Sequence, residues 1–178
     1  PILAAPLQRI LDWVRGRPAT PTDPVAAKEP RVRRILLTGA AGGVAGLIRP
    51  ALAERYEAVR LTDRVPVANL AENEEFVQAA LEDSEDVDAA VSGMDGIVHL
   101  GGASKEQPLE ALIPANIVGM HHMLEAARRH GVPRFVFAST MHLMGFYERT
   151  DALSDNSPIR PDSRYAATKA FGEALAQV

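Results

Sequence analysis

Short apolar runs alternate with helical patterns from residue 31 to the C-terminus, and this alternation constrains the fold more than any other feature. A run typical of a buried strand covers residues 32–39, and further strands are predicted at residues 58–63, 75–81, 95–102 and 133–140. Helical patterns cover residues 47–56, 84–93, 112–131 and 160–178. Strands separated by helices predict an α/β fold with a doubly wound parallel sheet.

Three details of the helices are also predicted. Pro50 lies within residues 47–56 and should kink that helix or mark a late start, because proline has no amide proton to donate. Ser84 is expected to cap the next helix, whose first turn is acidic. Gly131 is expected to end the long helix at residues 112–131.

The first thirty residues have a different character from the rest. Apolar residues recur at helical spacing between residues 3 and 14, and residues 18–30 are rich in proline without a periodic pattern. We therefore predict a helix and a stiff linker over residues 1–30, followed by one folded domain over residues 31–178.

Composition narrows the classes of function. The 178 residues are 47% hydrophobic and 24% charged, which is ordinary for a globular domain. A net charge of −4 argues against nucleic acid as a partner, and no apolar run approaches the roughly 18 residues that span a membrane. The absence of cysteine excludes disulfides and thiolate chemistry, and a reducing cytoplasm is the expected location. His121 and His122 are neighbours on a helix and point apart, so no metal site is predicted.

A glycine-rich turn, "TGAAGGVAG", follows the first strand and contains Gly39, Gly42 and Gly43. Such a turn allows the backbone to approach a pyrophosphate at a helix N-terminus, although it also occurs for purely steric reasons. Asp63 ends the second strand and can accept hydrogen bonds from ribose hydroxyls, which favours NAD. Arg64 beside it could instead pair with the 2′-phosphate of NADP.

The fourth and fifth strands end in residues that are expected to lie at the same edge of the sheet and to contact a dinucleotide there. Gly101 and Gly102 would let a dinucleotide lie across it, and Ser139 or Thr140 would supply a hydroxyl there. His99 lies inside an apolar run and is more typical of a core histidine than of a ligand.

Tyr165 and Lys169 are four residues apart and share one face of the last helix. An unperturbed tyrosine has a pKa near 10 and is a poor base at neutral pH. A neighbouring ammonium group favours the phenolate and brings the pKa towards the working range. The pair therefore suggests an acid/base function, with the strand-end hydroxyl holding the substrate oxygen.

Four motifs together resemble the extended short-chain dehydrogenase/reductases, the NAD-dependent epimerase/dehydratase group, with a Rossmann-like fold. They are "TGAAGG", "DGIVHLGG", "FASTMHLMGFY" and "RPDSRYAATKAFGE". Within the group, the chain is most similar to the uronate dehydrogenases. The resemblance implies an NAD-dependent dehydrogenase that oxidises a sugar acid, from a uronate to an aldarolactone. The resemblance also allows a homodimer, since helices beside the fourth and fifth strands form a dimer face in this family.

The resemblance also assigns roles by position. It implies a catalytic triad of Thr140, Tyr165 and Lys169. It implies a substrate site that includes Ser104, Thr140 and His142. The cofactor-binding residues that it supports, together with those expected from the turn and the strand ends, are Gly39, Gly42, Gly43, Asp63, Leu100, Gly101, Gly102, Ser139, Tyr165 and Lys169.

The chain departs from the family pattern at several positions. Ala45 replaces the third glycine of the turn, Ala80 stands where many members have an aspartate, and Met141 replaces an asparagine of the uronate dehydrogenases. The sequence also ends at Val178, before the family's substrate-binding part, so a C-terminally truncated, incomplete fold is expected. A nucleotide-sugar epimerase or dehydratase, and a non-catalytic dinucleotide-binding fragment, are the alternatives.

Overall fold

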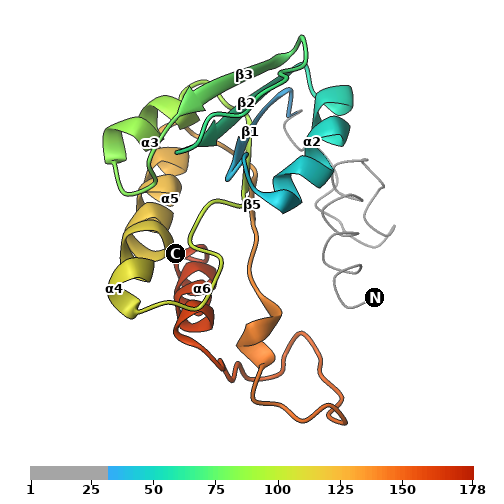
Figure 1. Ribbon diagram of the computed structural model, residues 1–178, viewed down its shortest axis with the longest axis vertical. Coiled ribbons are helices and arrows are strands. Elements are labelled where there is room, and N and C mark those ends of the chain that lie inside the picture. Colours follow the sequence, from blue (N-terminus) through green and yellow to red (C-terminus); the bar gives the residue numbers. More distant parts are fainter. Residues whose placement is uncertain (1–31) are drawn as a thin grey trace.

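Five parallel strands form the centre of the protein, a computed structural model of which describes residues 32–178 (Figure 1). The strand order is β3-β2-β1-β4-β5, and every neighbouring pair is parallel. The strands are β1 (Arg34–Thr38), β2 (Ala58–Asp63), β3 (Glu74–Gln78), β4 (Gly96–His99) and β5 (Phe135–Phe137). The order reverses at β1, so the chain is doubly wound, and the predicted α/β class is confirmed.

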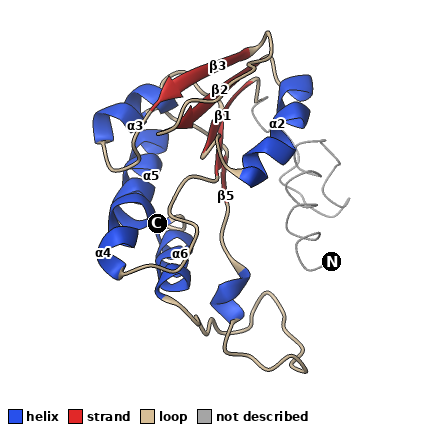
Figure 2. Ribbon diagram, in the orientation of Figure 1, coloured by secondary structure: helices blue, strands red, loops and turns tan. Residues whose placement is uncertain are grey.

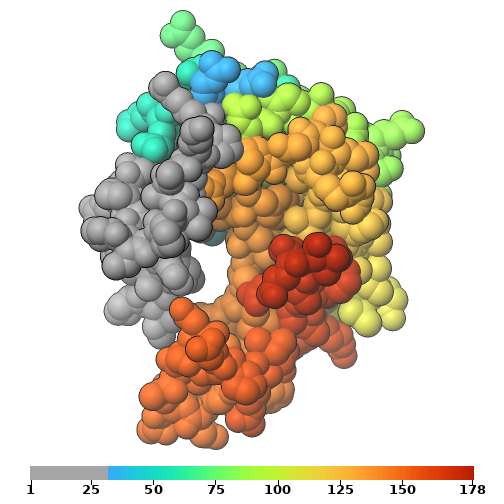
Figure 3. All heavy atoms as spheres, turned by 180° about the vertical axis from the view of Figure 1, so that it is seen from behind, coloured from blue at the N-terminus to red at the C-terminus, as the bar shows by residue number. Residues whose placement is uncertain are grey.

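Helices cover both faces of this sheet (Figure 2). They are α2 (Gly43–Arg55), α3 (Ser84–Val91), α4 (Leu109–Leu112), the π-helical η1 (Ile113–Val118), α5 (Gly119–Arg129), the 3₁₀ turn η2 (Met141–Met144) and α6 (Arg164–Leu175). Helix α2 lies on one face, and α3 and α5 lie on the other (Figure 1). Helix α6 packs against η1 and α4, and from behind it is seen at the surface, in red (Figure 3).

The core explains why β1 occupies the middle of the sheet. Ile35, Leu36 and Leu37 are completely buried, and successive side chains of a strand point to opposite faces. Ile35 and Leu37 therefore pack in the layer that includes Ile48 of α2, whereas Leu36 packs in the layer that includes Met123 of α5. A strand that is apolar on both faces is stable only between two layers of helices.

One predicted helix start and one predicted helix cap are wrong. Helix α2 begins at Gly43, so Pro50 lies within the helix instead of marking a late start. Pro50 is on the exposed side of α2, away from the buried Ile48 and Leu52, so core packing continues past it. The cap of α3 is Asp83, whose carboxylate accepts hydrogen bonds from the amides of Glu85 and Asp86 at 2.9 and 3.1 Å.

Other expectations about the chain have separate outcomes. Gly131 follows α5 with a φ of +65°, the left-handed conformation expected where a helix ends. The helix and linker predicted for residues 1–30 lie outside the described residues. Within residues 32–178, no helix is both long and apolar enough to cross a membrane, and no three His, Asp or Glu side chains group as metal ligands.

His99 lies in the core, as the sequence predicts. Its side chain is 1% exposed, and its Nδ1 lies 2.7 Å from the hydroxyl of Thr38. That hydroxyl oxygen also accepts a hydrogen bond from the amide of Gly101 at 3.0 Å, so its proton is free to be donated to Nδ1. Burial, with a smaller effect of the Lys169 ammonium, lowers the pKa of His99 to about 3.

We expect the free energy of unfolding to fall as the pH drops below about 6.5, the ordinary pKa of histidine. The unfolded chain binds this proton first because the pKa of buried His99 is about 3. Between pH 6.5 and 5 the loss approaches about 1.4 kcal/mol per pH unit, while most carboxylates are still ionised in both states. Urea titrations of the protein and of His99→Gln, in which this slope should be lost, test the prediction.

His121→Gln is the matched control because His121 is exposed on α5. That variant should keep the slope of the unchanged protein. Equal slopes for His99→Gln and the unchanged protein would mean that buried His99 does not cause the acid sensitivity.

Candidate functional site

The glycine-rich turn joins β1 to α2 at the carboxyl edge of the sheet. Gly39 has a φ of +68°, and its carbonyl accepts a hydrogen bond from the amide of Gly42 at 2.9 Å. A Cβ atom on Gly39 would lie 2.8 Å from the nitrogen of Gly101 and 2.9 Å from the carbonyl carbon of Leu100. The backbones after β1 and β4 are therefore in direct contact, which only glycine permits at this position.

Gly39→Ala is expected to lower the free energy of unfolding by about 2 kcal/mol, because it adds both a strained φ and a backbone clash. Gly46→Ala is the control, since a Cβ at Gly46 meets no atom within 4 Å and the residue is inside α2. That substitution should instead stabilise the protein by about 0.5–1 kcal/mol. Urea denaturation of both variants gives the comparison, and a similar cost for the two would contradict the close approach at Gly39.

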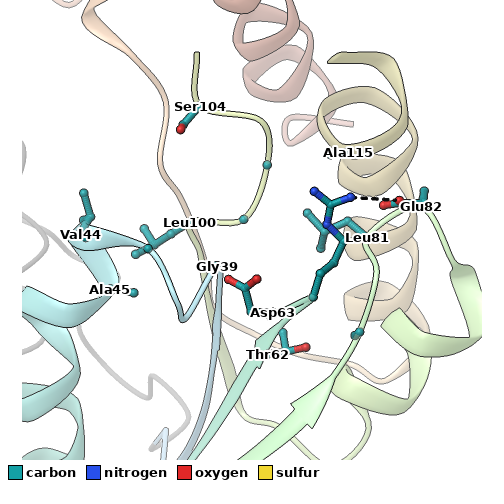
Figure 4. Close-up of a pocket in the computed structure, with 16 residues that line it drawn as sticks. Gly39, Val44, Ala45, Thr62, Asp63, Leu81, Glu82, Leu100, Ser104 and Ala115 are labelled. Atoms are coloured by element: carbon teal, nitrogen blue, oxygen red, sulfur yellow. Dashed lines mark ion pairs between the residues drawn. The ribbon is translucent and has the colours of Figure 1, made fainter. Parts of the chain in front are cut away.

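The N-terminus of α2 lines an open pocket with the turn (Figure 4). The cap residue is Gly42, which has no side chain that could accept hydrogen bonds from the first amides of the helix. A Cβ at Gly43 would meet no atom within 4 Å. The first amides of a helix have no partner within it and attract anions. This part of the pocket can therefore hold a phosphate group.

Asp63 lies at the end of β2 and lines the same pocket (Figure 4). One carboxylate oxygen accepts a hydrogen bond from the amide of Ala41 and the other from the amide of Val65, each at 3.1 Å. Each carboxylate oxygen has a further lone pair, so the group can also accept hydrogen bonds from a ligand. The residues predicted for the cofactor that the structure brings together here are Gly39, Gly42, Gly43, Asp63, Leu100, Gly101 and Gly102.

The segment after β4 completes the pocket and carries Ser104, which sequence analysis assigned to the substrate. The buried amide of Asn116 holds this segment in place. Its Oδ1 accepts a hydrogen bond from the amide of Ala103 at 2.7 Å, and its Nδ2 donates to the carbonyl of Ala103 at 3.0 Å and to the hydroxyl of Thr168 at 2.9 Å. Asn116 therefore connects the pocket to α6, which carries Tyr165.

Tyr165 lies in the first turn of α6, beyond the residues that line the pocket. Ser163 caps this helix by accepting a hydrogen bond from the amide of Ala166 at 3.1 Å, and Glu106 accepts one from the amide of Tyr165 at 2.9 Å. Burial raises the pKa of the Tyr165 phenol above its ordinary value, and a hydrogen bond with the Thr140 side chain partly offsets this effect. The predicted proximity of Tyr165 and Thr140 is therefore present in the structure.

Lys169 is 6% exposed and lies one turn after Tyr165. Its Nζ donates a hydrogen bond to the carbonyl of Ala138 at 2.9 Å and lies 4.5 Å from the ring centre of Phe137. The distance from Nζ to the ring centre of Tyr165 is 5.9 Å. Burial lowers the pKa of Lys169 to about 8. The expected lowering of the Tyr165 pKa by this ammonium is not found, because burial of the phenol dominates.

His142 lies beside Tyr165, with 6.4 Å between the two ring centres in an edge-on arrangement. Its Nδ1 is 2.9 Å from a carboxylate oxygen of Asp162, and this contact lowers the pKa of the Asp162 carboxyl. A Cβ on Gly145 would collide with the Asp162 carboxylate, so glycine is required there. Asp162 fixes the imidazole with Nδ1 as its donor, which leaves Nε2 available to a ligand.

Ser139 follows β5, and its Oγ is buried without a hydrogen-bond partner among residues 32–178. Buried hydroxyls are normally paired, so this atom is suited to a ligand. Sequence analysis missed four polar residues of this region. They are Glu82, Glu106, Asn116 and Asp162. Of these four, only Asn116 stands out in the sequence, because its polar amide lies inside the apolar segment "LIPANIV".

Comparison with known proteins accords with this geometry. The model of the NAD dependent epimerase/dehydratase family matches residues 35–178. The chain belongs to this family. Ala45, which the resemblance places at the third glycine of the turn, has its methyl group buried in the core between α2 and the sheet. Ala80 donates its amide to Asp86 at 3.0 Å and does not line the pocket, whereas its neighbours Ala79 and Leu81 do.

Several relatives in the family are uronate dehydrogenases. The chain is 47% identical over 147 residues to the enzyme of Agrobacterium fabrum and covers 56% of its length. It is 44% identical to that of Pseudomonas syringae pv. tomato and covers 52% of its length. These matches include 83% and 80% of the present chain. The chain thus spans about half the length of the curated relatives it matches.

The same likeness extends to three dimensions. The crystal structure of a variant of the Agrobacterium tumefaciens uronate dehydrogenase in complex with NAD is 46% identical, with a TM-score of 0.80. The match covers 83% of the present chain and 56% of that protein. The Rossmann-like fold predicted from the sequence is therefore confirmed, over part of the length of these relatives.

Proposed function

We propose that the protein is an NAD-dependent dehydrogenase that oxidises a sugar acid, converting a uronate to an aldarolactone. The observation that carries this proposal is that the buried Asn116 links two groups of residues through its hydrogen bonds to Ala103 and Thr168. One is the pocket with Asp63 and the glycine turn, and the other is the cluster of Thr140, Tyr165 and Lys169. The similarity to uronate dehydrogenases supports the same substrate class.

The residues of the pocket fit a dinucleotide. The open space beside Gly43 leaves room for a pyrophosphate at the start of α2, and Asp63 is positioned for the adenosine ribose. The buried hydroxyl of Ser139, which has no partner among the described residues, suits the nicotinamide end. When bound, NAD supplies the hydride acceptor and a positively charged nicotinamide ring that favours a nearby phenolate.

Tyr165 is the acid/base group in this proposal. As a phenolate, it takes the proton from the anomeric hydroxyl of the sugar, and the Thr140 hydroxyl holds the same oxygen. In the protein with NAD bound, the Lys169 ammonium, whose Nζ lies 5.9 Å from the tyrosine ring centre, adds to the effect of the nicotinamide charge, and together they offset the burial that disfavours the phenolate. His142 and Ser104 are assigned to the sugar acid, with Nε2 of His142 free because Asp162 holds Nδ1.

NAD binding and NADH formation test the proposal in two separate measurements. Calorimetric titration should show that the protein binds NAD, and absorbance should show NADH formation with galacturonate or glucuronate. Failure to bind NAD would contradict the proposed cofactor. Binding of NAD without turnover of any uronate would favour the non-catalytic alternative.

Turnover of a nucleotide sugar in place of a uronate would favour the epimerase or dehydratase alternative, because the same triad serves that chemistry. Met141 is the residue that motivates this comparison, since it is 59% exposed beside Thr140 and replaces an asparagine of the uronate dehydrogenases. A cytoplasmic location and a homodimer stay predictions from the sequence and from the resemblance.

A further inference from the structure

An ion pair between Arg64 and Glu82 lies at the ribose end of the pocket. The Nη1 atom of Arg64 is 3.7 Å from a carboxylate oxygen of Glu82, and the dashed line in Figure 4 marks this contact. Both residues line the pocket that contains Asp63, and both also line the adjoining hollow with Lys105. The pair therefore borders both the pocket and the hollow and is not packed against the core.

The backbone on both sides of this arginine is fixed. Asp63 accepts a hydrogen bond from the amide of Val65 at 3.1 Å, and the side chain of Gln78 donates one to the carbonyl of Arg64 at 3.0 Å. The side chain of Arg64 is 71% exposed, and within residues 32–178 its one ion pair is that with Glu82. Among the described residues, the Glu82 carboxylate is thus the ion-pair partner that attracts the guanidinium group.

The charges at this point decide between two kinds of ribose. A carboxylate such as Asp63 accepts hydrogen bonds from a free 2′-hydroxyl and repels a 2′-phosphate, whereas an arginine binds a phosphate with two parallel hydrogen bonds. Asp63 and Glu82 contribute two negative charges against the single positive charge of Arg64. Glu82 both occupies the guanidinium and adds repulsion, so it acts twice against a phosphorylated ribose.

We propose that Glu82 restrains Arg64 and thereby selects a dinucleotide with a free 2′-hydroxyl, NAD, over its 2′-phosphorylated counterpart, NADP. The inference rests on the proposed dinucleotide site and adds a specificity-determining residue to it. Asp63 alone favours NAD, but the adjacent Arg64 would reduce that preference if its guanidinium were free. Glu82 removes this conflict.

Glu82→Ala tests the inference through binding, independently of turnover. Calorimetric titrations with NAD and with NADP should show that the ratio of NADP to NAD affinity rises by about five- to tenfold, as expected for a freed arginine near a phosphate in water. The double variant Glu82→Ala/Arg64→Ala should lose the part of this gain that comes from the freed arginine and keep only the smaller part that comes from the lost repulsion. The gain should also shrink between about 20 mM and about 500 mM salt, because exposed charges are screened.

Glu57→Ala is the matched control. Glu57 pairs with Arg33 at the same distance of 3.7 Å and is 59% exposed, but it does not line the pocket. This variant makes the same change in net charge and should leave the affinity ratio unchanged. An equal rise of the affinity ratio in Glu57→Ala would mean that the change in net charge causes the effect, and it would overturn the inference.

Two further outcomes are distinguishable. If the unchanged protein binds NAD and Glu82→Ala shows no rise in the affinity ratio, the inference on Glu82 is overturned and the dinucleotide site stands. If the unchanged protein binds neither dinucleotide, the proposed function is overturned, and the inference that rests on it is overturned as well.

Discussion

Tyr165→Phe is expected to lower kcat for uronate oxidation by about 10³-fold, within the range that a positioned acid/base group contributes. The substitution removes only the phenol oxygen, and the ring remains beside His142 and Lys169. NADH formation measured at saturating NAD and uronate gives the result. Neither neighbour can replace the lost group. The Thr140 hydroxyl is a much weaker base than a phenolate, and the Lys169 ammonium donates its hydrogen bond to the carbonyl of Ala138.

Tyr147→Phe provides the control for this experiment. Tyr147 also has a hydrogen-bonded phenol, which donates to the carbonyl of Pro158 at 2.8 Å, and it lies outside the proposed site. That variant should retain turnover within about threefold, because no proton of the reaction passes through it. Undiminished turnover in Tyr165→Phe would rule out Tyr165 as the acid/base group.

Asn116→Ala is expected to lower the free energy of unfolding by about 3 kcal/mol. The change leaves the amide and carbonyl of Ala103 without their partner and removes one of the two hydrogen bonds of the Thr168 hydroxyl, which still donates to the carbonyl of Tyr165 at 2.7 Å. An unpaired buried polar group costs about 1–3 kcal/mol, and water reaches part of the half-buried Ala103, so the total is less than the sum. Urea denaturation measures the loss.

Ile113→Ala is the control for Asn116, since it lies in the same π-helical segment and is 39% exposed. It should cost less than about 1 kcal/mol, because partly exposed apolar groups contribute less. NAD affinity should fall in Asn116→Ala and not in Ile113→Ala, because Asn116 also holds the segment of Gly101 and Gly102. Equal effects of the two variants would contradict a specific function of the amide.

The sequence predicts the arrangement of strands and helices well, and the reason is local. Most strands have an apolar run of their own, and the central β1 is buried on both faces, whereas the edge strand β3 has only Phe76 and Val77. The errors lie at helix starts. The start of α2 depends on the turn at Gly39, and the start of α3 depends on which of two adjacent polar residues, Asp83 or Ser84, faces the free amides.

The candidate site was only partly predictable, again for physical reasons. Gly39, Asp63, Tyr165 and Lys169 lie in short patterns that carry their chemistry in sequence order. Other residues act through contacts with partners distant in the sequence, and their own segments resemble ordinary polar surface. These residues are Glu82, which pairs with Arg64, Glu106, which pairs with Arg164, and Asp162, which holds His142.

The π-helical turn η1 sets the direction of the side chains in the middle of one long helix. A π-helical turn contains an extra residue, and each residue of an α-helix turns the chain by about 100°. Deleting one residue within η1 would convert the segment to a regular helix, which leaves α4 and α5 nearly in phase but changes the direction of the residues inside the turn. Asn116 would then point away from Ala103 and Thr168, although no polar group had been removed. The alignment of the pocket with α6 is therefore a matter of helix length counted in single residues.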